Sequence, residues 1–313
     1  MRISNTAFSD NFLYTVNNLQ QQENTLQSEA SSGQKISRPE DNPSVMAQVL
    51  NDQASQASAA HYSSNITQLQ SEATTSATAM NSLQTLSSRV NEIATLASNG
   101  TNSSAQLSTY ANEMTSLIQQ AAQIGNTQDG EGNYIFSGTA SNKEPFATAT
   151  DASGAVTSVS YQGNSNTAQS EIASNVKVAA LVPGANTSGS GALGLFADSR
   201  TGVDLFAHMI SLQQDLASGN AAAISTTDAA AVANDADHIV AQISANGVMQ
   251  SALTTAGNIA TSQTANLTTQ ISGDTNADLA QTLTQLDQTQ TAYEAALESG
   301  TKIMGLSLLN YIH

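Results

Sequence analysis

The sequence predicts a mainly α-helical protein: an elongated antiparallel helical rod or coiled coil with paired terminal helices and a small inserted β-rich domain. Apolar residues recur at heptad spacing near both ends of the chain. Residues 44–98 contain no Pro or Gly, and strand-like alternation is confined to the middle of the chain. The predicted domains are a terminal coiled coil (1–42 and 274–313), a helical rod (43–138 and 201–273) and a β-rich outer domain (139–200).

The composition limits what this chain of 313 residues can bind. Its formal net charge is −17 and its 8 Lys and Arg residues are scattered, whereas phosphate backbones and anionic membranes are bound by clustered cations. No run approaches the roughly 20 apolar residues of a membrane span, and Met1–Leu13 lacks the features of a cleaved secretory signal. The absence of Cys excludes disulfides and thiolate sites. We therefore expect neither nucleic acid nor a membrane as a partner.

A heptad helix is predicted at the N-terminal end. Its apolar positions alternate in steps of three and four, and Glu23 fills one slot. Gly33 ends this helix, and a segment rich in breakers follows up to Pro43. Asn42 is then expected to cap a new helix that has Pro43 at its first position. That helix, over 44–98, would be about 80 Å long, which is typical of a rod.

The middle and the second half of the chain complete the predicted order of elements. After a return helix over 107–124, the segment 129–138 indicates a turn, a short strand and a second turn. Alternation over 156–161 and β-branched residues at 176–178 predict strands. Helix resumes near Gly202. A long Ala- and Thr-rich helix is then predicted over 221–271, with an interruption at Gly273 and Asp274.

The two chain ends are predicted to need partners. Full burial of the N-terminal apolar stripe yields on the order of 10 kcal/mol, which is less than the backbone entropy of ordering about 30 residues. We therefore expect termini that order on assembly, with an apolar cluster at the C-terminus that packs between subunits. The predicted protein-interface residues are Phe8, Phe12, Val16, Leu19, Leu26, Leu279, Leu283, Leu286, Tyr293, Leu297, Leu306, Leu308, Leu309 and Tyr311.

The histidines do not predict a catalytic or metal site. His61, His208, His238 and His313 lack His-Glu-x-x-His spacing, and no Cys is present to assist them. We interpret Asp237 and His238 as solvated polar residues, because adjacent side chains on a helix diverge. Ser and Thr are too abundant for a nucleophile to be singled out. No enzymatic activity and no cofactor are therefore expected.

The spacing Asp274-x-Asn276-x-Asp278 resembles the opening of a calcium loop. The sixth position of that loop, normally Gly, is Leu279 here, and its closing Glu is Gln285. We therefore predict no calcium site and interpret Asp274 or Asn276 as a helix cap.

Three segments resemble the flagellin family. They are LQSEASSGQKISRPEDNPSVMAQVL (26–50), DGEGNYIFSGTASNKEPF (129–146) and the ending SLLNYIH (307–313). The middle segment is similar to the branch of the family that joins hook to filament. The resemblance implies a non-enzymatic structural subunit of the flagellum, with a role in motility.

The same resemblance implies partners and a location. The partners would be hook-associated protein 1, flagellin, further copies of the chain in a ring, and a cytoplasmic export chaperone. The location would be extracellular, after export by the flagellar apparatus without signal cleavage. Three other hypotheses stay open at this point: a self-polymerising filament flagellin, a secreted hydrolase on a flagellin-like scaffold, and an unrelated coiled-coil adhesin.

Overall fold

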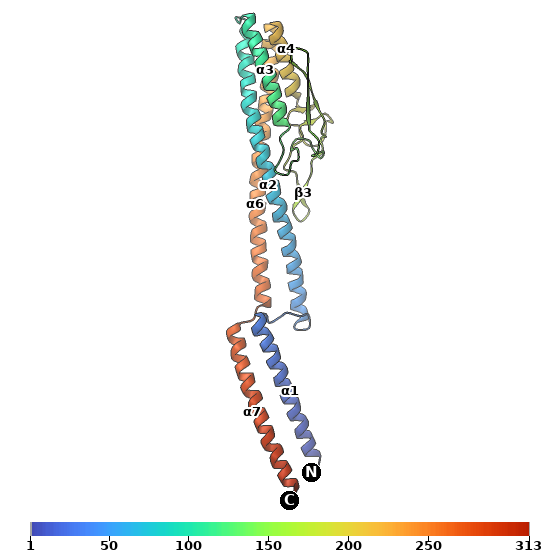
Figure 1. Cartoon of the computed structure of the whole chain (residues 1–313), viewed down its shortest axis with the longest axis vertical. Helices are drawn as coiled ribbons and strands as arrows, with labels where there is room; N and C mark the ends of the chain where they lie inside the picture. The colour runs from blue at the N-terminus through green and yellow to red at the C-terminus, as the bar shows by residue number, and fades with distance from the viewer. Residues whose placement is uncertain (1, 313) are drawn as a thin grey trace. The chain divides into compact units, whose positions relative to one another are not determined.

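The computed structural model describes residues 2–312, with side chains described over 9–302, and it divides into two compact units. The terminal unit joins residues up to Ser58 with those from Gln263 onward, and the central unit is Ala59–Ser262. The prediction of a mainly α-helical chain is confirmed (Figure 1). The helices are α1 (Arg2–Ser32), α2 (Pro43–Ser98), α3 (Ser104–Gly125), α4 (Leu205–Ser218), α5 (Ala221–Ala223), the π-helix η1 (Ile224–Asp228), α6 (Ala229–Thr275) and α7 (Leu279–Ile312).

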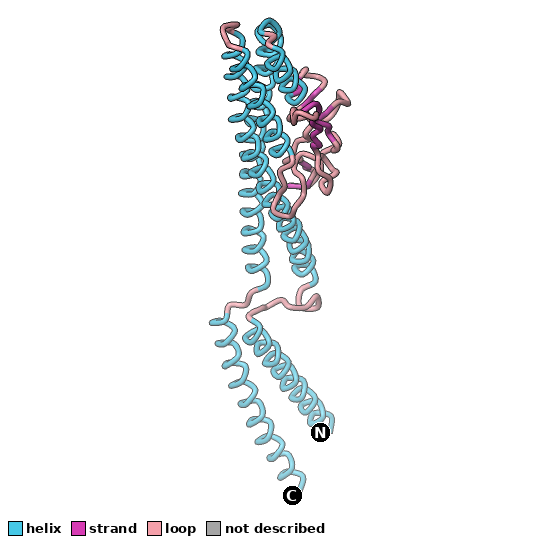
Figure 2. Tube along the Cα trace, turned by 45° about the horizontal axis from the view of Figure 1, so that its top comes forward, coloured by secondary structure: helices cyan, strands magenta, loops and turns pink. Residues whose placement is uncertain are grey.

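The strands lie between α3 and α4 in sequence and along one side of these helices (Figures 1 and 2). They form an antiparallel β1–β2 pair, an antiparallel β3–β4 pair and a three-stranded β5–β6–β7 sheet. The predicted strands at 156–161 and 176–178 are confirmed as β2 and β4. The bounds are β1 (Phe146–Thr150), β2 (Val156–Tyr161), β3 (Ser170–Ala173), β4 (Val176–Val178), β5 (Ala185–Asn186), β6 (Ala197–Asp198) and β7 (Val203–Asp204).

The segment 129–138 is a chain of turns, and the strand predicted there is wrong. Asp129 Oδ1 accepts the backbone N–H groups of Glu131 (2.8 Å) and Asn133 (2.9 Å), which closes a side-chain turn. The β-type pairing of this segment is an isolated bridge between Gln128 and Tyr134. The turn delivers the apolar residues after it into the core, where Phe136 is fully buried.

The core of the central unit contains an aromatic cluster of Phe136, Phe146, Phe196 and Phe206. Phe196 stacks on Phe206 with ring centroids 5.4 Å apart, and Phe146 lies 4.7 Å from Phe196. Gly125, at the end of α3, leaves room for the Phe146 ring, since a Cβ there would overlap it. The cluster belongs to one apolar core with α2, α3, α4 and α6, so the strands and the helices share a core.

Local capping explains where the helices begin. Asn42 Oδ1 accepts the N–H of Val45 at 3.2 Å, which confirms the predicted cap of α2. Ser103 begins α3 with a reciprocal capping box to Gln106. Asp278 Oδ1 accepts the N–H groups of Ala280 (3.0 Å) and Gln281 (3.2 Å) at the start of α7. The cap is therefore Asp278. The predicted assignment to Asp274 or Asn276 is wrong, because α6 continues to Thr275.

α6 is more regular than the sequence predicts, and it begins and ends a few residues later than the predicted helix over 221–271. It runs from Ala229 to Thr275 without a break at Gly247, Gly257 or Gly273. Tertiary packing offsets the cost of about 1 kcal/mol per helical Gly, since Leu253 is fully buried and Gly257 lies beside Ile66 of α2. Before α6, the π-helix η1 widens one turn, which no sequence pattern indicated.

The terminal unit contains the predicted pairing of α1 with α7, which run antiparallel (Figure 1). A backbone clasp joins the loops at their inner ends. The N–H of Lys35 donates to Thr275 O at 2.8 Å, and the N–H of Ala277 donates to Gly33 O at 2.9 Å. The side chain of Lys35 adds a bond to Gly273 O at 3.1 Å. The clasp therefore fixes where the α1–α7 helix pair begins.

The aromatic cluster makes Phe196 a sensitive position. We expect Phe196→Ala to lower the free energy of unfolding of the central unit by about 3–5 kcal/mol, because it leaves a cavity among three rings. The exposed neighbour Leu193 is the control, and Leu193→Ala should change it by less than about 0.5 kcal/mol. Chemical denaturation measures both variants. A similar loss of unfolding free energy in the two variants would contradict the assignment of Phe196 to the core.

Two helical glycines should respond in opposite ways to Ala. In α6 a Cβ at Gly247 meets nothing within 4 Å, so Gly247→Ala should stabilise by about 0.5–1 kcal/mol. In α7 a Cβ at Gly300 would overlap the Phe12 ring, so Gly300→Ala should destabilise the terminal pair by about 1 kcal/mol. Unfolding followed by helical circular dichroism distinguishes them. Equal stabilisation would show that the pair is not closely packed at Gly300.

Candidate assembly interface

The face of α1 toward α7 follows the predicted heptad. Phe12, Val16 and Leu19 are half-buried and Leu26 is buried. Polar side chains extend the same seam, because Gln290 of α7 donates to Glu23 Oε1 at 3.1 Å. The side chain of Phe8 lies outside the described residues. The seam is thin on the α1 side, where Leu26 is the buried residue among these four.

The face of α7 toward α1 differs from the predicted one. Leu286 and Tyr293 lie on the seam, but its other positions are small. Thr282, Thr289 and Gly300 are buried, whereas Leu279, Leu283 and Leu297 are 48%, 52% and 39% exposed. Small residues let the backbones approach closely, as Gly300 does over Phe12. The prediction required both heptad spacing and apolar residues, which selected the leucines; Thr282, Thr289 and Gly300 share a heptad frame with Leu286 and Tyr293 but are not large and apolar.

Both helices of the terminal unit therefore keep large apolar side chains exposed. We use the name outer stripe for five of them, Leu13 and Tyr14 of α1 and Leu279, Leu283 and Leu297 of α7, of which Tyr14 is the most exposed at 70%. Leu306, Leu308, Leu309 and Tyr311 belong to α7 by backbone, but their side chains lie outside the described residues. Large apolar side chains exposed together are typical of protein–protein contacts.

The segment between α1 and α2 is ordered by its own polar groups. Asp41 Oδ2 accepts the N–H groups of Ser37 (3.0 Å) and Arg38 (2.8 Å), and these hydrogen bonds lower the pKa of Asp41. Ile36 is buried beside the clasp, and the N–H of Ile36 donates to Thr275 O. The segment thus works as a fixed connector that sets where α2 starts.

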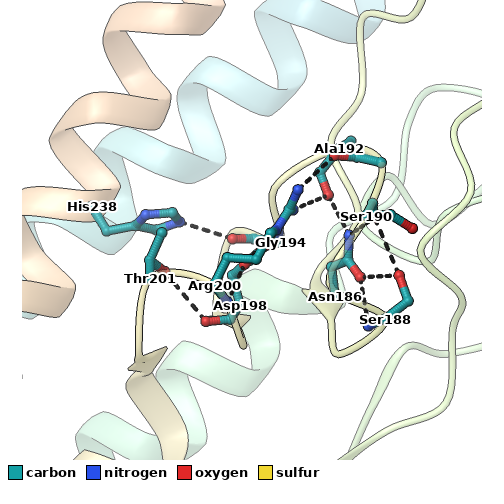
Figure 3. A network of polar contacts seen from close by, with 10 residues as sticks. Asn186, Ser188, Ser190, Ala192, Gly194, Asp198, Arg200, Thr201 and His238 are labelled. Carbon is teal, nitrogen blue, oxygen red and sulfur yellow. Dashed lines mark hydrogen bonds and ion pairs between the residues drawn. The ribbon is translucent and has the colours of Figure 1, made fainter.

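In the central unit, a polar network ties the loop before β6 to α6 (Figure 3). Asp198, a buried carboxylate, accepts the N–H of Gly194 at 3.0 Å and an N–H of the Arg200 guanidinium at 2.7 Å. The hydrogen bonds from Arg200, with those from backbone N–H groups, lower the pKa of Asp198 to about 2. His238 Nε2 bonds to Gly194 O at 2.8 Å. Asn186 donates to the carbonyls of Ser190 and Ala192.

Two histidines occupy structural positions that the sequence did not indicate. His238 is buried against Gly194, so the interpretation of His238 as solvated is wrong, although Asp237 is exposed. The Nδ1 of His208 lies 2.8 Å from Asp235 Oδ2, in a half-buried pair. Over the described residues, no three His, Asp or Glu side chains are grouped to hold a metal ion. The helices of this same part of the chain are each too short or too polar to cross a bilayer.

The chain is similar to known flagellar proteins. Residues 3–141 match the family model for the bacterial flagellin N-terminal helical region, which confirms the resemblance seen in the sequence. A 150-residue stretch is 25% identical to flagellar hook-associated protein 3 of Salmonella typhimurium. That match covers 48% of this chain and 47% of the Salmonella protein, about half of its length.

Solved structures share the fold at low sequence identity. A hook-associated protein described as putative, from Vibrio parahaemolyticus, has a TM-score of 0.62 at 20% identity, over 76% of this chain and 100% of that chain. Hook-associated protein 3 of Legionella pneumophila has a TM-score of 0.59 at 14% identity, over 72% of this chain and 98% of that chain. Xanthomonas campestris FlgL has a TM-score of 0.58 at 16% identity, with 71% and 99% covered.

The low pKa of Asp198 makes a prediction for acid solution. A lowered carboxyl pKa contributes stability that is present above the ordinary value of 3.8 and is lost as the pH falls toward 2. We expect Asp198→Asn to lower the free energy of unfolding by roughly 2 kcal/mol at pH 7. This difference from the unmodified chain should shrink as the pH falls from 4 to 2. Urea unfolding across this range measures it. Asp237→Asn, at an exposed position of α6, is the control. A difference independent of pH would rule out the ion pair as its source.

Proposed function

We propose that this chain, whose residues 3–141 match the family model for the bacterial flagellin N-terminal helical region, is a structural subunit of the bacterial flagellum that forms the junction ring between hook and filament. The observation that carries the proposal is the outer stripe on a thin, paired terminal unit. A free subunit leaves this stripe in water, whereas an assembled one covers it. The similarity to hook-associated protein 3 favours the junction over the filament.

The proposed mechanism is mechanical. α1 and α7 join a wall of helices contributed by neighbouring subunits, and burial of the outer stripe drives the association. Each of its five side chains is 39–70% exposed, so covering it contributes roughly 1 kcal/mol per residue, repeated in every subunit of a ring. The interface in this proposal also includes the predicted α1 residues from Phe8 to Leu26 and the C-terminal cluster from Leu306 to Tyr311. No catalytic step is part of it.

The proposed partners follow from the same assignment. They are hook-associated protein 1 on one side, flagellin on the other and further copies of this chain within the ring. An export chaperone would hold the terminal helices before secretion. The location is extracellular, reached through the flagellar export apparatus without signal cleavage.

Two leucines of the outer stripe provide the test. We expect Leu279→Ser with Leu283→Ser to abolish motility of a complemented deletion strain, because a subunit contact is lost. The free energy of unfolding of the purified chain should change by less than about 0.5 kcal/mol, since both side chains are half exposed. Gln281→Ser with Gln285→Ser, exposed positions on the same helix, is the matched control and should swim normally.

The outcomes separate interface from core. A clear loss of stability in the double leucine variant would make these residues part of the intramolecular core. Full motility with unchanged stability would mean that the stripe has no role in assembly.

The position in the flagellum is tested separately. Gold-labelled antibodies should mark a narrow band where hook meets filament, and the purified chain should stay unpolymerised under conditions in which flagellin forms filaments. Labelling along the filament with spontaneous polymerisation would assign the chain as a filament flagellin instead. Substrate cleavage in a broad peptidase assay would favour a hydrolase on this scaffold.

A further inference from the structure

Two buried carboxylates of the central unit are only half satisfied. Asp228, the last residue of η1, is 2% exposed, and Asp235, in the second turn of α6, is fully buried. Asp228 Oδ2 and Asp235 Oδ1 have no hydrogen-bond partner among the described residues. A buried carboxylate without a compensating charge or hydrogen bonds is costly, so the groups that face these two decide whether they can stay ionised.

α4 supplies one bonded partner to each of them, from positions one turn apart. Ser211 Oγ donates to Asp228 Oδ1 at 2.9 Å, and His208 Nδ1 lies 2.8 Å from Asp235 Oδ2. The His208 side chain is 27% exposed, so it can exchange protons with solvent. One histidine thus joins α4 to α6, and the serine one turn later joins α4 to η1.

Three acidic side chains of the described residues act on His208. Asp235 faces it from α6, Asp228 from η1 and Asp204 from the N-cap of α4, while Asp215 of α4 lies against Asp228. On the opposite side, α3 meets α4 through neutral groups, since Gln213 donates to Thr115 at 3.0 Å. The Tyr161 hydroxyl of β2 is a neutral group that lies 2.8 Å from Phe136 O and 2.9 Å from Asn164 O, and it donates its one proton to these carbonyl oxygens. Among the contacts just described, protonated His208 is therefore the group that brings a positive charge close to Asp228 and Asp235.

We propose that His208, Asp228 and Asp235 form a proton-operated latch, which holds α4 against η1 and α6 while His208 is charged and loosens when His208 is neutral. In the charged state, His208 compensates Asp235 directly and Asp228 at longer range. When His208 loses its proton, two buried carboxylates with open oxygens remain beside Asp204 and Asp215. Repulsion between these carboxylates and the cost of keeping their charges buried then both weaken the contact of α4 with η1 and α6.

The pKa values of all three groups move in the same direction. The hydrogen bond to Asp235 raises the pKa of His208, and burial raises the pKa values of Asp228 and Asp235. Each raised pKa means that the folded state binds its proton more tightly than the unfolded state does. The stability from His208 is therefore fully present below the ordinary histidine pKa of about 6.5 and is lost as the pH rises through the raised value.

Thermal unfolding between pH 6 and pH 9 tests the latch in the full chain. We expect His208→Gln to lower the midpoint of the central unit by about 2–4 °C at pH 6, and this difference from the unmodified chain should shrink toward pH 9. His61→Gln, an exposed histidine on α2, is the matched control and should follow the unmodified chain at every pH. A His208→Gln difference that is the same at pH 6 and pH 9 would overturn the proposal.

Histidine NMR and hydrogen exchange give readouts that a merely structural contact would not move. In the unmodified chain, His208 should titrate above the usual histidine range, and the amides of α4 should lose protection as it does. Asp235→Asn should move the titration of His208 to lower pH, whereas Asp237→Asn, an exposed position two residues further along α6, should not. Titration of His208 at or below about 6.5 in the unmodified chain would refute the latch whether or not the variants fold.

Discussion

The packing of Phe196 between Phe146 and Phe206 is the contact on which the central unit depends. Four of the six Phe residues in the chain meet in this cluster, in a sequence with only 4% aromatic residues and no Trp. The remaining apolar contacts between the helices of this core involve Ala, Val, Leu, Ile and Met. Concentrating the bulk at one place lets long, slender helices keep thin contacts elsewhere, and it fixes the strands to the helices at the same point.

Among the described side chains, the terminal unit shows no comparable aromatic centre. Its seam combines half-buried apolar residues of α1 with Thr282, Thr289 and Gly300 of α7. Such a seam brings the backbones close but buries little apolar area, while Leu279 and Leu283 point away from it. A helix pair of this kind gains stability when other helices cover it. We therefore expect the central unit to be held by its own core and, under the proposed function, the terminal unit to be completed by partners.

Polar groups of the central unit hold irregular backbone in place. Asp198 is matched by Arg200 and by the N–H of Gly194, so its charge is stable over a wide range of pH. Of the carboxylates beneath α4, Asp235 bonds to a histidine and Asp228 to a serine, and in our proposal the strength of this contact follows the proton of the histidine. The same residue type thus produces a rigid connection in one place and a responsive one in another, according to whether its partner titrates.

The sequence by itself determined the features that depend on local pattern. Heptad spacing predicts α1, alternation predicts β2, and the Asn42–Pro43 pair predicts the start of α2, because caps and periodicity act within a few residues. Tertiary structure decided the rest. It placed Leu283 outside the seam and Gly300 inside it, buried His238 against Gly194, and carried α6 through Gly247. Burial of a side chain depends on which segment packs against it, and that segment is often a hundred or more residues away in the sequence.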